Sequence, residues 1–397
     1  MSRRALTLFL GILLVSGISA KEPDISVVDP VSVLFANNNR FALHLFPLLD
    51  SSSSNVLFSP FSLYSALSMV WMGAEEKTKE AMQHALQFSL EPSDLKQAYS
   101  QFFLKREDSR LKIANAVWAN RDTFFLPSFL FTLQENFQAN ASSLDFKNSV
   151  RSSSIINEWI ENQTEGKIPT LLEPSQIDPL TRMIVTNALY FKGRFSSPFD
   201  PGQTKDAPFY PSEDHSLVAP MMHQVNSFSY FEDEDFQVLS LPFEKEEKED
   251  QNISLLIFLP TRREGLSLSV KQLKEAIRGL KRRTVNVMLP KFTQRQRLIL
   301  NDPLKHLGME IAFSERADFS KINGLHDLFL SLVIHEAYVA LDEMGVVAAA
   351  ATAASMKTTA VRPTLALDFL ANRPFLFLLV DLDTQGIFFL GKLYTPL

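Results

Sequence analysis

The sequence has no cysteine among its 397 residues and only 13 glycines. Without a thiol the chain can form no disulfide, hold no cysteine-ligated zinc ion and use no cysteine nucleophile. Glycine makes up about 3% of the chain against a usual share of about 7%. Glycine-rich phosphate loops are therefore scarce, and the composition argues against a nucleotide-binding fold. The stability of the fold must come from its core alone.

Neither charge nor polarity dominates the composition. Lys plus Arg number 39 and Asp plus Glu 45, and hydrophobic residues make up 46% of the chain. These values are typical of a globular protein and exclude the disordered, collagen-like and coiled-coil classes. No internal repeat and no long linker divides the sequence after its first 20 residues. We therefore expect residues 21–397 to form one large domain.

The first 20 residues have the pattern of a secretory signal peptide. Arg3 and Arg4 form a basic start, residues 5–15 an apolar run, and small residues lead up to Ala20. The apolar run is shorter than the roughly 20 residues that cross a bilayer. The sequence thus predicts a secreted, extracellular protein with no membrane span. Three sequons would be glycosylation sites in such a protein, at Asn140, Asn162 and Asn252.

Helical patterns come first along the chain and strand patterns follow. Ser59 and Pro60 are typical of a helix start, and the helix ends at Gly73 with one apolar face that includes Leu63, Leu67, Val70 and Trp71. Further helices are predicted at 75–86, 92–104, 127–137 and 150–162. Strands are predicted at 184–191, 237–241, 253–259, 284–289, 330–341, 375–380 and 387–393. This order indicates an α+β fold.

The common enzyme motifs are absent. The sequence contains no nucleophile elbow, no zinc-protease helix, no Walker loop and no dinucleotide-binding fingerprint. The pair His335 and Glu336 has no second histidine at helical spacing and lies in an apolar strand pattern. We therefore expect no catalytic residue, metal, cofactor or nucleic-acid partner. A secreted hydrolase whose serine triad is assembled in space stays an alternative.

Basic residues are concentrated in one stretch of this acidic chain. Local potential rather than net charge governs encounter with an anion, so the stretch could bind a heparin-like polyanion. The alternative is an ordinary exposed helix face followed by strand ends. The set consists of Lys271, Lys274, Arg278, Lys281, Arg282 and Arg283, and it is followed by Lys291, Arg295 and Arg297.

A segment of small residues follows the strand that ends at Leu341. Gly345 and Val346 lead into four consecutive alanines at 348–351. Small uncharged side chains are what a segment would need to slide between two existing strands, because bulky or charged groups would clash or be desolvated there. An alanine-rich helix or surface loop is the alternative.

Five separated motifs give the chain a resemblance to the serpin family over nearly all of residues 21–397. They are Asn55–Ser62, Thr186–Gly193, His335–Gly345, Asn372–Phe377 and Gly391–Pro396. Phe195 is a departure, because the family usually carries tryptophan there. The resemblance implies a monomer with many helices, three β-sheets and an exposed reactive loop at about 346–363.

The resemblance also implies a suicide inhibitor of serine proteases and not an enzyme. A protease would attack the loop and form an acyl-enzyme, and the cut loop would then insert as a new strand and trap the protease. A noninhibitory carrier or chaperone is the alternative within the family. The hinge of the loop would comprise Glu343, Gly345, Val346, Ala348, Ala349, Ala350 and Ala351. Val346 stands where the family usually has threonine or serine.

Two further sets of residues follow from the resemblance. A polar cluster beneath the opening sheet would control strand separation, and its members would be Ser59, Ser62, Asn187 and His335. Family spacing places the attacked residue sixteen positions after Glu343, so the reactive bond would join Thr359 and Ala360. Thr359 would suit the shallow pocket of an elastase-like protease. Lys357 and Arg362 are the alternative reactive residues, in that order.

Overall fold

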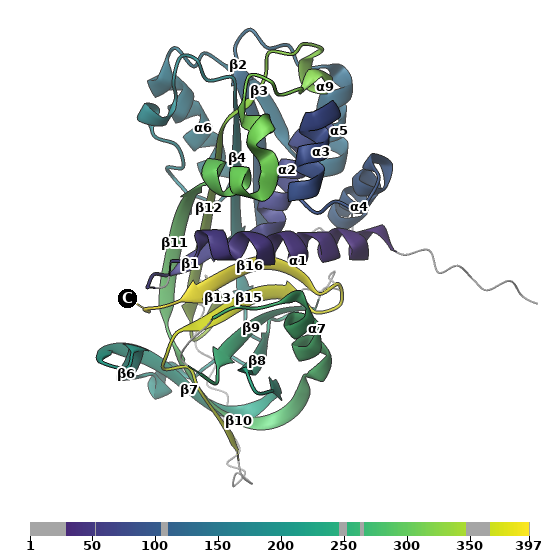
Figure 1. The fold of residues 1–397 in the computed structure, drawn as a ribbon. Coiled ribbons are helices and arrows are strands. Elements are labelled where there is room, and N and C mark those ends of the chain that lie inside the picture. Colours follow the sequence, from purple (N-terminus) through teal and green to yellow (C-terminus); the bar gives the residue numbers. More distant parts are fainter. Residues whose placement is uncertain are drawn as a thin grey trace, which may run out of the picture.

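A computed structural model describes residues 29–51, 53–104, 110–245, 252–262, 266–346 and 366–396. Most of the helices gather in the upper part of the molecule, α1 crosses its middle, and β6 to β10 lie below (Figure 1). The described α-helices are α1 (Pro30–Leu49), α2 (Pro60–Met72), α3 (Glu76–Ala85), α4 (Pro92–Leu104), α5 (Pro127–Phe137), α6 (Ser149–Gln163), α7 (Val270–Gly279), α8 (Asn301–Leu304) and α9 (Ser320–Asn323). None of the helices in these ranges is long and apolar enough to cross a membrane.

The upper hydrogen-bonded network of strands contains the long parallel pair that matters for the site. Its order is β3-β2-β4-β12-β13-β5, and β11 pairs with β12 at the side. The members are β2 (Leu111–Asn120), β3 (Asn140–Leu144), β4 (Met183–Phe191), β5 (Gly193–Arg194), β11 (Phe292–Ile299), β12 (Leu330–Asp342) and β13 (Gly345–Val346).

The other network has the order β1-β16-β15-β9-β8-β7-β10-β14, with β6 paired to β7. Its members are β1 (Val56–Phe58), β6 (Lys205–Ser212), β7 (His215–Glu232), β8 (Phe236–Pro242), β9 (Ile253–Pro260), β10 (Lys281–Pro290), β14 (Leu367–Leu370), β15 (Phe375–Asp381) and β16 (Gly386–Leu393).

The three sheets that the family resemblance implies thus appear as two hydrogen-bonded networks. The reason is the 18-residue strand β7. Its first part pairs with β6, its middle and end with β10, and its last four residues with β8. Because β7 is continuous, it joins two of the three sheets into one hydrogen-bonded network.

Helix α2 is buried on every side and not along a single face. The Ser59 hydroxyl accepts a hydrogen bond from the Ser62 amide at its start, as the sequence predicts. Every residue from Pro60 to Trp71 is buried, including Ser65 and Ser68. The prediction of one apolar face was wrong because the helix runs through the core. A helix surrounded by protein has no solvent face for polar residues to mark.

The sequence prediction missed the 20-residue helix α1, the short strands β1 and β3, and several irregular or two-sided strands. β2 lies in the half that the pattern marked as helical, and β6, β7 and β11 were not predicted. β11 alternates charged and polar residues, and the alternation in β7 is broken because this strand serves two sheets. The predicted strands and helices otherwise match the observed ones to within a few residues at each end.

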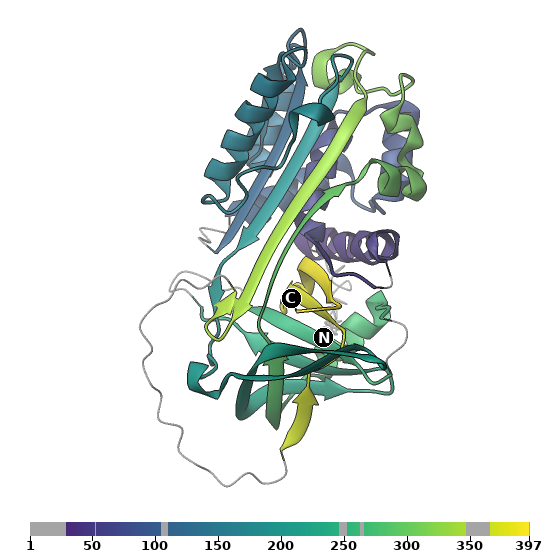
Figure 2. The ribbon, with the colours of Figure 1, turned by 90° about the vertical axis from the view of Figure 1, so that its left-hand side faces the viewer.

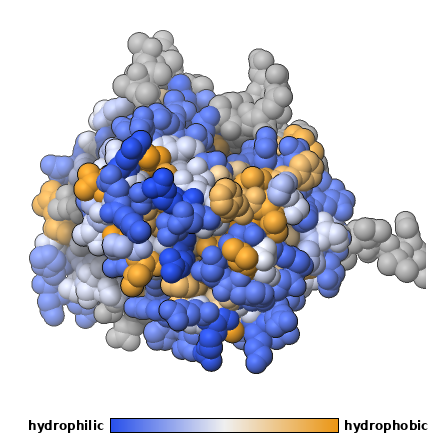
Figure 3. Space-filling view, turned by 90° about the horizontal axis from the view of Figure 1, so that it is seen from above, coloured by the Kyte–Doolittle hydropathy of each residue, from blue (hydrophilic) through white to orange (hydrophobic). Residues whose placement is uncertain are grey.

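Seen from above, the surface is mostly hydrophilic with one gathered apolar area (Figure 3). Exposed apolar side chains on and near α5 and α9 at this end include Phe124, Phe131 and Leu325. In Figure 1 this end lies opposite the strands β7 and β10 and away from β13.

Candidate functional site

The candidate site is the seam between β4 and β12. These strands pair in parallel, with His335 directly opposite Asn187 and Tyr338 opposite Tyr190. Figure 2 shows β12 as a long diagonal strand beside β4, with α6 to the left of them on the same sheet. Any additional strand entering this sheet here would have to separate the two.

A buried polar cluster connects both sides of this seam to α2. His335 Nδ1 lies 2.5 Å from Asn187 Oδ1, and the Ser59 amide donates to His335 Nε2 at 2.9 Å. Asn187 in turn donates to the Ser62 hydroxyl. Ser59, Ser62, Asn187 and His335 have no exposed surface. The structure therefore brings the four predicted cluster residues together at the middle of the seam.

The charge state of His335 follows from its burial. Desolvation lowers the pKa of His335 to about 3, which the hydrogen bond with Asn187 only partly opposes. The ring is neutral at neutral pH, and because Nε2 accepts from Ser59, Nδ1 carries the hydrogen and donates to Asn187. One hydrogen bond of this neutral ring therefore spans the two strands of the seam.

Two members of the cluster were missed by the sequence prediction. Asn115 on β2 accepts a hydrogen bond from Asn187, and its own amide donates to Ser65 Oγ at 3.1 Å. Both residues are buried. The sequence offers one signal for Asn115, which is a polar residue between Ala114 and Ala116. This signal indicates a buried polar site only if β2 is already known to be a strand.

The hinge begins with a buried carboxylate. Glu343 accepts from Lys291 Nζ at 2.8 Å and from Thr204 Oγ1 at 2.7 Å. Burial by itself would raise the pKa of Glu343, but the hydrogen bonds from Lys291 and Thr204 outweigh it and lower the pKa. The Phe199 amide also donates to the Glu343 carbonyl oxygen at 2.8 Å. The start of the hinge is therefore held by Thr204 and Phe199, from the segment between β5 and β6, and by Lys291, which joins β10 to β11.

Gly345 and Val346 form the short strand β13, which lies between β12 and β5. Val346 pairs with Leu341 on one side and Gly193 on the other. Gly345 has φ near +145°, and a Cβ there would lie 2.1 Å from the Gly193 carbonyl oxygen. Glycine is therefore required at this position by both backbone conformation and space.

Val346 was expected at the start of an exposed loop, and the structure corrects this boundary. Its side chain is only 2% exposed. With Phe191, Val339 and Phe377 it lines an apolar cavity of about 10 Å³. The residue is buried because β13 already belongs to the sheet. The rest of the predicted hinge and loop, namely Ala348, Ala349, Ala350, Ala351, Lys357, Thr359, Ala360 and Arg362, lies outside the described residues.

Phe195 fills its site without a tryptophan. Its side chain is 1% exposed and stacks on Phe243 with ring centroids 5.1 Å apart. Its amide donates to the Met344 carbonyl oxygen at 2.8 Å. Phe195 thus contributes to the frame that holds the hinge turn.

The basic stretch divides into two parts. Lys271, Lys274 and Arg278 lie on α7, and Lys281, Arg282 and Arg283 begin β10, where all three are exposed. Glu275 pairs with Lys271, and Asp235 accepts from Gln272, so acidic groups border this patch. The cations that follow are engaged elsewhere, because Lys291 binds Glu343, Arg295 binds Glu336 and Arg297 binds Glu173.

The sequons lie on three different elements. Asn140 is half-buried at the start of β3, Asn162 is exposed near the end of α6, and Asn252 is half-buried just before β9. The Asn252 carbonyl oxygen accepts from the Leu382 amide at 3.0 Å. The predicted signal peptide lies outside the described residues. No group of three or more potential metal ligands occurs in the part of the chain that the structure describes.

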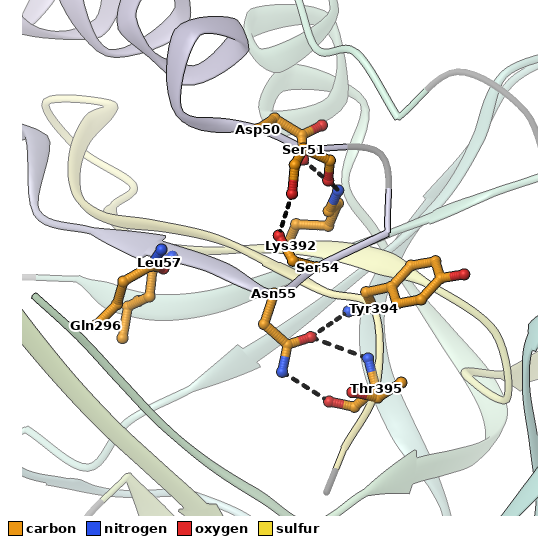
Figure 4. Close-up of polar contacts among 9 residues, drawn as sticks. All are labelled: Asp50, Ser51, Ser54, Asn55, Leu57, Gln296, Lys392, Tyr394 and Thr395. Carbon is orange, nitrogen blue, oxygen red and sulfur yellow. Dashed lines mark hydrogen bonds and ion pairs between the residues drawn. The ribbon is translucent and has the colours of Figure 1, made fainter. Parts of the chain in front are cut away.

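Two motifs from opposite ends of the chain meet in space. The Asn55 side chain accepts from the Thr395 amide at 2.9 Å and donates to the Thr395 carbonyl oxygen at 2.8 Å (Figure 4). Lys392, with a side chain only 2% exposed, binds Asp50 and the Ser51 carbonyl oxygen. These contacts fix β1 against β16, and β1 leads directly into the cluster residue Ser59.

Comparison with known proteins identifies the family. Residues 36–396 match the family described as Serpin (serine protease inhibitor). The chain belongs to the serpin family. A serpin relative, the leukocyte elastase inhibitor of Sus scrofa, is 35% identical over 386 residues, which cover 91% of this chain and 99% of the relative.

Solved serpin structures have the same fold. Serpin48, described as a highly specific serpin of the insect Tenebrio molitor, superposes with a TM-score of 0.80 at 26% identity and covers 94% of this chain and 100% of its own. Native protease nexin-1, solved with heparin, gives a TM-score of 0.81 at 27% identity, with coverage of 92% and 100%. The predicted family and fold class are therefore confirmed.

Proposed function

We propose that this serpin is a suicide inhibitor that traps a serine protease by inserting its cleaved loop between β4 and β12. The observation that carries the proposal is the position of β13. Gly345 and Val346 pair with β12 on one side and with β5, which follows β4 along the chain, on the other. The hinge therefore already lies in line with the seam into which the rest of the loop would continue.

The inserted segment would gain hydrogen bonds along its whole length. About a dozen residues could each contribute roughly 0.5–1.5 kcal/mol net. The uncut protein would then be held away from its free-energy minimum by the tethered loop and the closed seam. The small uncharged residues from 345 to 355 suit this movement. The inhibitor would act once and would not turn over.

We further propose Thr359–Ala360 as the reactive bond and an elastase-like protease as the target. Incubation with pancreatic or neutrophil elastase is expected to give a covalent complex that survives SDS. Mass spectrometry of the denatured complex should find a released fragment of 38 residues, 360–397. A fragment that begins at Thr358 would instead identify Lys357 as the reactive residue and a trypsin-like protease as the target. Cleavage with no complex would favour a noninhibitory serpin.

The hydrolase alternative is tested in the same experiment. A secreted hydrolase should turn over a small ester without any added protease, whereas a serpin should not.

We also propose that residues 1–20 direct export, that the exported protein is a monomer and that its sequons carry glycans. Amino-terminal sequencing of the secreted protein tests export, light scattering tests the monomer, and glycosidase treatment tests the glycans.

As a second proposal, the patch on α7 and β10 binds heparin-like polyanions. The observation that favours it is the exposure of Lys281, Arg282 and Arg283 next to the cations of α7. Replacing all three with alanine is expected to lower the salt concentration of elution from heparin resin, because fewer counterions are displaced. Neutralising the engaged cations Arg295 and Arg297 should have a smaller effect. Unchanged elution of the triple variant would exclude this patch.

A further inference from the structure

The segment after α6 lies across the seam and is packed on both of its strands. This segment, residues 166–173, is called the strap here. Ile168, Leu171 and Leu172 of the strap are fully buried. They belong to one apolar cluster with Ile184 and Ala188 of β4 and Leu332 and Ile334 of β12. In Figure 2, α6 lies to the left of these strands, on the near side of the sheet. The strap must therefore shift before the strands can separate.

The strap is held on the α6 side by one asparagine. Asn157 Oδ1 accepts from the Leu171 amide at 3.0 Å and the Leu172 amide at 2.8 Å. Its side-chain amide donates to the Leu172 carbonyl oxygen at 2.8 Å. This anchor moves with α6, so it does not by itself hold the strap to the sheet.

On the other side, two arginines of β11 hold the backbone of the strap. Arg297 Nη1 donates to the Leu171 carbonyl oxygen at 3.2 Å, and Arg295 Nη2 donates to the Lys167 carbonyl oxygen. Arg297 also lies 3.8 Å from Glu173 Oε1. Because β11 pairs with the outer edge of β12, these contacts reach over β12 to the strap.

Strand β11 is itself firmly placed. Its side chains alternate, so Gln296 points away from Arg295 and Arg297. On that opposite face Gln296 Oε1 accepts from the Leu57 amide of β1 (Figure 4). The arginines therefore extend from a strand that is fixed to the sheet below and cannot simply follow the strap.

A buried carboxylate aligns the two arginines. Glu336 on β12 lies directly opposite Arg297 in the strand register, on the same face as Leu332 and Ile334. Its side chain is 3% exposed, and its Oε1 lies 3.7 Å from Arg295 Nε. Burial raises the pKa of Glu336, while Arg295 and Arg297 lower it. A buried carboxylate of this kind needs its cationic partners in place.

We propose that Glu336, Arg295 and Arg297 form a lock that fixes the strap across the β4–β12 seam and sets the rate at which the seam opens. These are positioning residues for strand insertion. The inference rests on the proposed inhibitory mechanism, because the seam opens only if a strand enters it. Without the contacts to β11, the polar anchor of the strap is on α6, and only apolar packing holds the strap to the seam.

The test uses a synthetic peptide with the sequence of residues 345–358, incubated with the intact full-length protein. Its incorporation is followed as a mobility shift on native gels, without any protease. Arg295→Ala/Arg297→Ala is expected to raise the rate of incorporation at least about tenfold, since the free-energy value of one charge-assisted hydrogen bond corresponds to about that factor. Arg297→Lys in place of Arg297→Ala should restore part of the slow rate, because lysine can still donate to the Leu171 carbonyl oxygen.

Two controls separate the lock from general destabilisation. Arg282→Ala removes an exposed arginine away from the seam and should leave the rate unchanged. Leu273→Ala removes a fully buried side chain of α7, so it lowers stability without touching the strap. Hydrogen exchange at the Leu171 and Leu172 amides should increase in the arginine variant and not in Leu273→Ala.

The outcomes are distinct. Equal incorporation rates in the arginine variant and in Arg282→Ala would overturn the lock and leave the inhibitory mechanism standing. Equal acceleration in the arginine variant and Leu273→Ala would also overturn it, because the effect would then follow from lower stability. If the peptide enters neither the parent nor any variant, strand insertion itself fails as the proposed function.

Discussion

Val346→Arg is expected to convert the protein from an inhibitor into a substrate of its target protease. The side chain at this position is buried in β13 and lines an apolar cavity. An arginine there would have to bury an unpaired guanidinium or force β13 out of the sheet, and either outcome blocks insertion at its first residue. The amount of SDS-stable complex should fall at least about tenfold, because burying an unpaired charge costs several kcal/mol. The loop should still be cut at the same bond.

The matched control is Val346→Thr, which is similar in size and uncharged and should keep complex formation. Both variants are compared with the parent on gels at equal protease concentration, and the released fragment is measured by mass spectrometry. If Val346→Arg forms as much complex as the parent, insertion does not proceed through β13 and the proposed mechanism is wrong.

Asn187→Ala should strongly destabilise the closed seam. Asn187 accepts from His335 and donates to Ser62 and Asn115, and all of these groups are buried. Alanine would leave His335 Nδ1 without a partner, which costs about 1–3 kcal/mol, and would remove two further hydrogen bonds, to Ser62 and Asn115, worth about 0.5–1.5 kcal/mol each. The expected loss of about 2–6 kcal/mol is a large part of the 5–15 kcal/mol that stabilises a typical domain. Unfolding in urea should become faster and its midpoint lower.

Asn226→Ala serves as the matched control, because Asn226 is exposed on β7 and its side chain bonds to Gln224 and Ser227 of the same strand. Its effect should stay within about 0.5 kcal/mol. If the two asparagine variants unfold at similar rates, the cluster does not hold the seam, and its role in strand opening should be abandoned.

Local patterns predicted many of the regular elements, although not α1, because such elements obey local rules. The Ser59 cap, the helix after it, and apolar strands such as β4, β12 and β15 were found in this way. Elements with non-local causes were missed. The strand β7 serves two sheets, and β11 presents arginines on one face and glutamines on the other. The helix α2 was predicted, but its burial on every side was not, because that burial depends on the surrounding core.

The candidate site was predicted in part. Family motifs pointed to His335 and Asn187, but Asn115 and Ser65 joined the cluster only when β2 and α2 were placed against each other. The basic stretch shows the limit most clearly. Along the chain Lys291, Arg295 and Arg297 continue a run of cations, yet in space they bind Glu343, Glu336 and Glu173.

The sequence by itself determined the fold class, the family and the small-residue segment, since these depend on local periodicity and on motifs that can be read residue by residue. Only the tertiary structure decided that Val346 is already buried in the sheet and that two arginines reach over β12 to the strap. Burial and charge pairing depend on which distant segments meet. A linear pattern does not contain that information, because the partners lie more than a hundred residues apart along the chain, as Arg297 and Leu171 do.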